Sequence, residues 1–240
     1  MSMFQFNADP QFVRNQQFHD ACRVGDQATA IKLLDDNPSD TYLIDVTRSD
    51  KPAILEASYG QHWDLCSELI KRGVDLNVKN LHGYSPLHVY AEHGQDDLIR
   101  LAVEHAAYIN RKDNRGQSPL YFACKADKEA TYDTIVSLGG EVNALTKELD
   151  SPMHWAARNG NASLAGKMIA RGAHAHGENN MGETPISLAK TDDMRAELER
   201  ASLMRTVEDA AATRKSQHES DPATAGQAEE PKPKRRILKA

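Results

Sequence analysis

The chain has 240 residues, of which 40% are apolar and 27% charged, and these fractions are ordinary for a globular protein. Its formal net charge of −6 at pH 7 argues against a general nucleic-acid binder, because phosphate binding depends on clustered lysines and arginines. No run of about 18 apolar residues occurs, so the sequence predicts no membrane-spanning helix.

The first residues and the cysteines bear on the compartment. Residues 1–16 are expected to form an N-terminal extension, and they lack the basic leader and apolar core of an export signal. Cys22, Cys66 and Cys124 are odd in number and have no paired spacing, which is typical of free thiols in a reducing compartment. A cytoplasmic location is therefore expected, with the nucleus as the alternative.

A proline recurs at nearly constant spacing along the middle of the chain, at Pro52, Pro86, Pro119, Pro152 and Pro185. The first interval is longer than the other three by a single residue, and those three are identical. A hydroxyl side chain precedes four of these prolines, namely Ser85, Ser118, Ser151 and Thr184. This internal repetition indicates stacked units that share a core with their neighbours.

Each unit is predicted to contain two helices. Ser or Thr followed by Pro starts a helix, because the hydroxyl accepts from free backbone amides and proline is tolerated in the first turn. A glycine about eight residues after the proline is expected to supply the positive torsion that ends this helix, at Gly60, Gly94 and Gly160. A second amphipathic helix follows, as in Leu98, Ile99, Leu101 and Ala102, and an extended segment leads to the next unit.

The two ends of the repeats are expected to be capped. The stretch from Phe18 to Leu34 has the repeat pattern without its proline, and residues 17–48 are the predicted N-terminal cap. Residues 180–210 are the predicted C-terminal cap, with a closing helix from Asp192 to about Asp209 whose outer face is charged. Residues 211–240 contain few large apolar side chains and are expected to form a disordered tail.

The repeat resembles the ankyrin repeat, whose threonine-proline-leucine-histidine signature corresponds to Ser85-Pro86-Leu87-His88 and to Ser151-Pro152-Met153-His154. The resemblance covers residues 17–203 and implies an all-α solenoid of helix-turn-helix units, about six including the caps. It also implies a non-catalytic protein that binds another protein. Departures from the family pattern include Asp127 in place of a helix-ending glycine and Leu149 in place of a turn glycine.

Several side chains invite a chemical interpretation that must compete with a structural one. His88 and His154 lie in the column whose ring, by the resemblance, bonds the neighbouring loop, and Cys124 beside His154 would otherwise look like a nucleophile and its base. His174, His176 and Glu178 provide too few ligands for a convincing metal site. We therefore expect no catalytic residue, no metal site and no cofactor.

Asparagines recur at Asn77, Asn110 and Asn143. The segments around Asn77 and Asn143 resemble sites that asparagine hydroxylases modify in some ankyrin proteins. The alternative is that each amide simply bonds loop backbone, and no modification is predicted.

Partner binding is expected on the concave face and the loop tips. Transfer of the family's variable columns to this sequence gives the candidate set Ser58, Tyr59, Leu81, His82, Tyr84, Glu92, His93, Asn114, Arg115, Gln117, Lys125, Asp150, Arg158, Asn159, Met181 and Glu183. Tyr, Arg, His and Met supply large contact area or paired hydrogen bonds at protein interfaces. The predicted function is therefore to bind, sequester, inhibit or scaffold a partner protein, and the chain itself is expected to be monomeric.

The basic end of the tail supports an alternative. Lys232, Lys234, Arg235 and Arg236 form a short basic cluster that can direct a protein to the nucleus or tether it to an acidic surface. Under this alternative the protein is a regulator or effector delivered to a nucleus or to a nucleic-acid complex. Nucleic-acid binding is expected, if at all, from the tail and not from the repeats.

Overall fold

The computed structural model describes residues 9–36, 52–200 and 202–203, and every regular element within these residues is an α-helix. The labelled helices are α1 (Pro10–Val24), α2 (Gln27–Asp36), α4 (Ala53–Tyr59), α5 (Trp63–Lys71), α6 (Pro86–His93), α7 (Asp96–Glu104), α8 (Pro119–Lys125), α9 (Glu129–Ser137), α10 (Pro152–Asn159), α11 (Ala162–Ala170) and α12 (Pro185–Leu188). Residues 192–200 and 202–203 are also helical. The predicted all-α fold class is confirmed.

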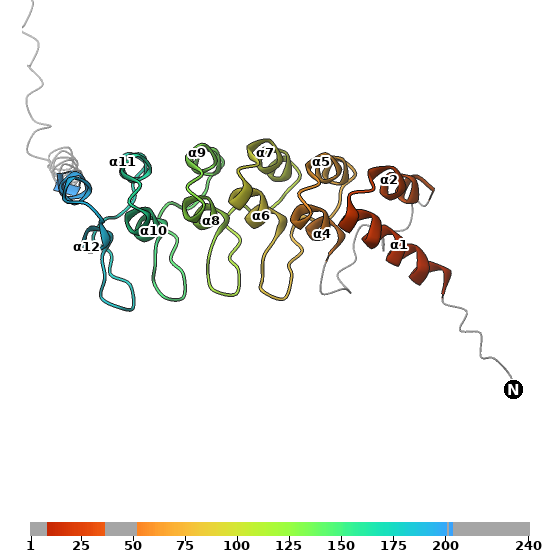
Figure 1. Ribbon diagram of the computed structural model, residues 1–240, viewed down its shortest axis with the longest axis horizontal. Helices are drawn as coiled ribbons and strands as arrows, with labels where there is room; N and C mark the ends of the chain where they lie inside the picture. Colours follow the sequence, from red (N-terminus) through yellow and green to blue (C-terminus); the bar gives the residue numbers. More distant parts are fainter. Residues whose placement is uncertain (1–8, 37–51, 201, 204–240) are drawn as a thin grey trace, which may run out of the picture.

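The helices lie in two rows that run along the molecule (Figure 1). One row holds the first helix of each repeat, α4, α6, α8, α10 and α12, and the other holds the second helices, α5, α7, α9 and α11. Each of α4, α6, α8 and α10 packs against its own second helix and against the next first helix. Long loops project beyond the first helices, and we call the surface made by the first helices and these loop tips the loop face (Figure 1).

The core is continuous because equivalent apolar residues stack from one repeat to the next. Leu87, Leu120 and Met153, each directly after the repeat proline, have at most 1% of their surface exposed. Ile99 and Ile135 fill the same layer from the second helices and are fully buried. The repeat spacing read from the prolines is therefore also the spacing of the core.

The first helices begin where the hydroxyl-proline pairs predict. Helices α6, α8, α10 and α12 each have a proline in their first turn. The side chain of Ser118 accepts from the backbone N–H of Tyr121 at 3.3 Å, and that of Thr184 accepts from the N–H of Ser187 at 3.1 Å. These bonds satisfy amides that would otherwise lack a partner at the helix start.

The prediction that Gly60 ends a helix with a positive φ is wrong. Gly94 and Gly160 have the expected positive φ, but Gly60 has a φ of −71°, and Gln61 adopts the left-handed conformation with a φ of 58°. Gly60 continues the right-handed turn and donates to the carbonyl of Glu56, so the chain reverses one residue later. Pro52 is the N-cap of α4, the position that Ser85 occupies at α6, so the proline alignment displaced this repeat by one residue.

Gly60 is required for a different reason, which is the packing of His62. A Cβ atom on Gly60 or on Gly25 would lie about 2.5 Å from the ring of His62, closer than real Cβ contacts allow. The imidazole Nε2 lies 3.2 Å from the carbonyl oxygen of Arg23 and donates to it. His62 thereby joins the end of α1 to the turn after α4.

Helices close both ends of the stack. At the N-terminal end α1 begins at Pro10, inside the segment expected to form an extension, and Asp9 accepts from the N–H of Gln11 at 3.0 Å. At the C-terminal end Met194 and Leu198 are 1% exposed and belong to the core, so the helix over residues 192–200 packs on the end of the stack. The tail beyond residue 203 lies outside the described residues.

Candidate partner-binding surface

Three asparagines at equivalent positions tie each loop to the next repeat. Asn110 donates from Nδ2 to the carbonyl of Gly139 at 3.0 Å and accepts at Oδ1 from the N–H of Glu141 at 2.8 Å. Asn77 and Asn143 make the same pair of bonds in their own repeats. The interpretation that these amides bond loop backbone is confirmed.

A second polar column shapes the loop tips, and the sequence reasoning missed it. Oδ1 of Asp113 accepts from the N–H groups of Arg115 and Gln117, at 2.9 and 2.7 Å. Asn80 and Asn179 hold their loops with the same two bonds. Thr146 takes this position in the remaining loop and accepts from the N–H of Asp150 at 3.1 Å. The signal was available, because these polar residues recur with the same period as the prolines.

The signature histidines are buried and are used by the fold. Nδ1 of His88 accepts from the N–H of Ser85 at 3.0 Å, and Nε2 donates to the carbonyl of Gln117 at 3.1 Å. His154 makes the equivalent bonds to Ser151 and to the carbonyl of Glu183. Burial lowers the pKa of His88 to about 4 and also lowers the pKa of His154. Both rings are neutral hydrogen-bonding groups at neutral pH.

The cysteines do not have the surroundings of nucleophiles. Cys22, Cys66 and Cys124 are free and buried. Burial raises the pKa of Cys22 to about 12 and also raises the pKa of Cys124, so both remain protonated thiols at neutral pH. Both ring nitrogens of His154 are already bonded within its own repeat and to the next loop. The chain therefore offers Cys124 no activating base in His154.

Most of the predicted binding residues lie on the loop face with accessible side chains. The exposed members are Tyr59, Leu81, His82, Glu92, Asn114, Arg115, Lys125 and Met181. The half-buried members are Tyr84, His93, Gln117, Asp150, Arg158, Asn159 and Glu183. Leu81 and Met181, which are large, apolar and exposed, make this surface the best candidate for contact with another molecule.

Ser58 does not belong to this accessible set. Its side chain is fully buried, its hydroxyl donates to the carbonyl of Ile54 at 2.6 Å, and the hydroxyl of Tyr90 lies 3.4 Å away. The N–H of Gln61 donates to Ser58 as the N–H of Gly94 donates to Ala91, so Ser58 is equivalent to the fully buried Ala91 and not to Glu92. We correct the prediction that Ser58 contacts a partner.

Two tyrosines from neighbouring repeats form an aromatic area near the middle of the loop face. The hydroxyl of Tyr59 accepts from Nδ2 of Asn80 at 2.8 Å. The ring of Tyr84 packs edge-on against Phe122, with 5.1 Å between ring centroids. Partial burial, with smaller contributions from Tyr84 and two nearby carboxylates, raises the pKa of Tyr59 to about 12. Aromatic surface and carboxylates are thus close together here.

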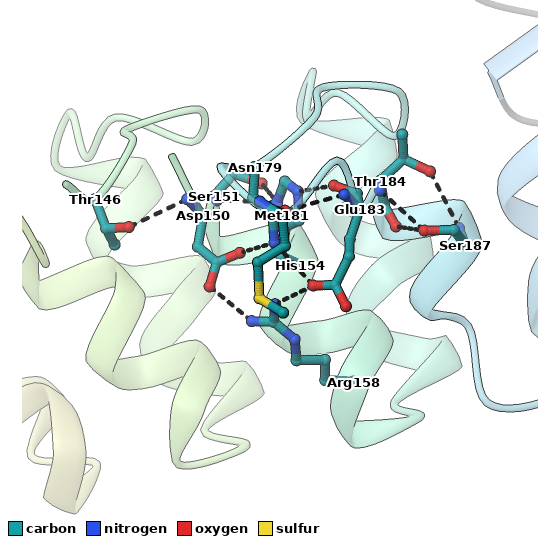
Figure 2. A network of polar contacts seen from close by, with 10 residues as sticks. All are labelled: Thr146, Asp150, Ser151, His154, Arg158, Asn179, Met181, Glu183, Thr184 and Ser187. Carbon is teal, nitrogen blue, oxygen red and sulfur yellow. Dashed lines mark hydrogen bonds and ion pairs between the residues drawn. The ribbon is translucent and has the colours of Figure 1, made fainter. Parts of the chain in front are cut away.

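Farther along the loop face, Arg158 is held between two carboxylates (Figure 2). Its guanidinium donates to Asp150 at 2.6 Å and to Glu183 at 2.9 Å. Asn179 donates to the same two carboxylates, at 2.8 and 3.0 Å. Burial opposes ionisation of Asp150, but the bonds from Arg158 and Asn179 outweigh it, and its pKa is lowered. These three candidate residues are therefore occupied with one another.

The described residues contain neither a cluster of metal ligands nor a membrane-spanning helix. Among the described residues, no three His, Cys, Asp or Glu side chains are grouped so that they could hold a metal ion. His174, His176 and Glu178 are all exposed. No helix in the described part of the chain is both long and apolar enough to cross a bilayer.

Comparison with known proteins identifies the class. A family model described as ankyrin repeats in three copies matches residues 18–113 and 53–146, which together make up more than half of the chain. With the stacked helix pairs and the bonded histidines, this places the chain in the ankyrin-repeat family. Ankyrin repeats are generally protein-protein interaction modules, and the family is typically non-enzymatic.

Two curated relatives are similar over part of the repeats. They are the neurogenic locus notch homolog protein 1 of human and that of Xenopus tropicalis, each 25% identical over 143 residues. The match covers 59% of this chain but only 6% of either relative. The chain therefore resembles a small portion of much longer proteins.

The basic cluster of Lys232, Lys234, Arg235 and Arg236 lies outside the described residues, and the structure does not bear on its predicted role in targeting.

Proposed function

We propose that this protein binds another protein through its loop face and that it acts by inhibition, sequestration or scaffolding, without catalysis. The observation that carries the proposal is the placement of large apolar side chains at the loop tips. Leu81 is 70% exposed and Met181 is 78% exposed, although the backbone of both loops is held firmly by hydrogen bonds. Exposed apolar side chains on a rigid support are typical of interaction surfaces.

The arrangement of recurring and variable residues supports the same proposal. The recurring serines, prolines, histidines and asparagines are used within the stack, as the bonds of His88 and Asn110 illustrate. Residues that differ between repeats, such as Leu81 and Arg115, extend exposed side chains from the same loops. Specificity for a partner is therefore expected from the variable set.

A double substitution tests the proposal. Replacement of Tyr84 and Arg115 by Ala should abolish capture of partners from a lysate of the source cell, while the melting temperature changes by only a few degrees, because neither residue is fully buried. A matched control replaces Glu104 and Arg100 by Ala on α7, in the row of second helices, and should leave capture intact. Unchanged capture by the Tyr84 and Arg115 variant would exclude the loop face.

The alternative, a regulator or effector targeted by its basic tail, needs a separate test. Removal of residues 231–240 should then change the cellular location of the protein or lower a salt-sensitive affinity for nucleic acid. No change in either property would exclude the targeting role.

A further inference from the structure

Two sets of four residues lie at equivalent positions of the repeats but carry different charges. Asp150, Arg158, Asn179 and Glu183 form what we call the Asn179 junction. The Asp113 junction consists of Tyr84, Glu92, Asp113 and Gln117, each two repeat periods before its counterpart. Each residue of one junction therefore occupies the same place in the backbone pattern as its counterpart in the other.

At the Asn179 junction the chain supplies its own cation. The guanidinium of Arg158 lies between the carboxylates of Asp150 and Glu183, which it contacts at 2.6 and 2.9 Å (Figure 2). Nδ2 of Asn179 donates to the same carboxylates, at 2.8 and 3.0 Å. The negative charges there have a cation between them, and the polar atoms have partners.

At the Asp113 junction the equivalent cation is missing. Glu92 stands where Arg158 stands two repeats later, and Asp113 stands in place of the neutral Asn179. Oδ1 of Asp113 is held by two backbone N–H groups, as Oδ1 of Asn179 is. The second oxygen of Asp113 therefore takes the place of Nδ2 of Asn179, the atom that donates to the two carboxylates that bind Arg158. Asp113 is 7% exposed, and this oxygen is buried without a hydrogen-bond partner.

The neighbouring side chains do not supply the missing charge. Glu92 is exposed and takes part in no ion pair within the part of the chain that the structure describes. The ammonium group of Lys125, on the neighbouring first helix, lies 5.7 Å from the ring centroid of Phe122. Burial raises the pKa of the Tyr84 hydroxyl, the carboxylates of Asp113 and Glu92 raise it further, and Arg115 only partly opposes them. Two carboxylates and one guanidinium therefore act on the Tyr84 hydroxyl.

We propose that the Asp113 junction is a subsite for an arginine side chain of the partner protein, which takes the place that Arg158 fills at the Asn179 junction. The guanidinium would stack on the half-buried ring of Tyr84, pair with Glu92 and offset the charge of Asp113. Arginine fits better than lysine, because its planar group both stacks on an aromatic ring and bonds a carboxylate through two N–H groups. This inference rests on the proposed function, because it names the chemistry of the partner residue at the loop face.

The subsite can be tested without the partner. The full chain, with its amides and tyrosine rings observed by NMR, is titrated with N-acetyl-arginine amide and, separately, with N-acetyl-citrulline amide, which has nearly the same shape without the charge. The arginine compound should cause saturable shifts at Tyr84 and at the amides of residues 113–117, and the citrulline compound should not. The amides of residues 179–183 should not shift, because Arg158 already occupies that junction.

Two variants of the full chain sharpen the test. Glu92→Gln should weaken binding of the arginine compound about threefold or more, the scale of a partly exposed ion pair. The matched control Glu104→Gln, an equally simple change on α7, should leave the affinity unchanged. Glu92→Arg should abolish binding without loss of thermal stability, because it places a guanidinium in the column of Arg158.

Four outcomes would overturn the proposal. These are no saturable shift with the arginine compound, equal shifts with citrulline, unchanged affinity in Glu92→Gln, or binding that appears only after Arg235→Gln and Arg236→Gln, which would make the chain's own tail the occupant. A failed titration with continued loss of partner capture in the Tyr84 and Arg115 variant would remove the subsite and leave the proposed function standing. Saturable binding of the arginine compound together with unchanged partner capture would support the subsite and exclude the proposed function.

Discussion

The imidazole of His88 is joined to the backbone of Gln117 across the boundary between two repeats. The distance from Nε2 to the carbonyl oxygen is 3.1 Å, and because a carbonyl can only accept, the proton is on Nε2. Nδ1 is then free to accept from Ser85 within its own repeat. The same arrangement links His154 to Glu183. The signature histidine is thus a connector between repeats, and its recurrence is no evidence of catalysis.

The connector role predicts a pH dependence. Burial lowers the pKa of His88 from its ordinary 6.5 to about 4, so the folded state binds this proton more weakly than the unfolded state. The stabilising contribution should be complete above pH 6.5, decline as the pH falls toward 4 and decline no further below it. NMR titration of the His88 ring and unfolding by urea at several pH values would check this. A ring that titrates near pH 6.5 would contradict the prediction.

Substitution of the core leucines should cause the largest losses of stability. Leu87 and Leu120 are at most 1% exposed, and replacement of either by Ala should lower the free energy of unfolding by about 2–5 kcal/mol, because it removes buried surface and leaves a cavity. Leu81→Ala is the matched control, because this loop-tip side chain is 70% exposed, and it should change the free energy by less than about 0.5 kcal/mol. Urea denaturation measures all three. Losses of similar size at Leu87 and Leu81 would mean that the core is assigned wrongly.

The left-handed backbone of Leu149 makes glycine a stabilising substitution at this position. Its φ of 61° is in the left-handed region, which costs a side chain with a Cβ about 1–2 kcal/mol, and 42% of its surface is exposed. Leu149→Gly should therefore raise the free energy of unfolding by about 0.5–1 kcal/mol after the greater entropy of glycine in the unfolded chain is counted. Leu145→Gly, also exposed but with no positive φ, should lower stability instead. Thermal unfolding of both variants would distinguish strain from a general effect of glycine.

The ion pair between Arg158 and Asp150 should make the stability of the last repeats depend on pH. The folded-state pKa of Asp150 is lowered, so the contribution of its pair with Arg158 is present above the ordinary carboxyl pKa near 4 and is lost as the pH falls through the lowered value. Arg158→Met should cost about 1 kcal/mol at pH 7 and progressively less below pH 4. The control Arg171→Met removes an exposed contact of 3.9 Å to Asp133 and should have little effect at either pH. An equal loss at pH 7 and at pH 2 would refute the ionic origin.

Much of the fold could be predicted because its signals are local and repeated. The hydroxyl-proline pairs specify where α6, α8, α10 and α12 begin, since cap and proline act within one helical turn. The spacing of Leu87 and Leu120 specifies the core, since identical units bury identical positions. The family resemblance implied that His88 bonds the neighbouring loop, and the tendency of asparagine amides to bond loop backbone predicted the role of Asn110. Both interactions are present in the structure.

The errors arose where one repeat departs from its neighbours. Pro52 was aligned with the first-turn prolines, but it is the N-cap of α4, so the left-handed turn falls on Gln61 and not on Gly60. For the same reason Ser58 was placed in a variable column, whereas it is equivalent to Ala91, and both are fully buried. Alignment by a single residue type fails where that residue takes a different position in one copy, because every column of that repeat is then displaced.

Residue types at fixed spacing were enough to specify the repeat period, the all-α class and the starts of α6, α8, α10 and α12. Which of the variable side chains meet depends instead on how the folded repeats pack. Arg158 pairs with Asp150 and Glu183, whereas Glu92 and Asp113 at the equivalent positions have no cation between them. These contacts join residues of different loops and helices, and they form only when packing of the helices brings neighbouring loops together.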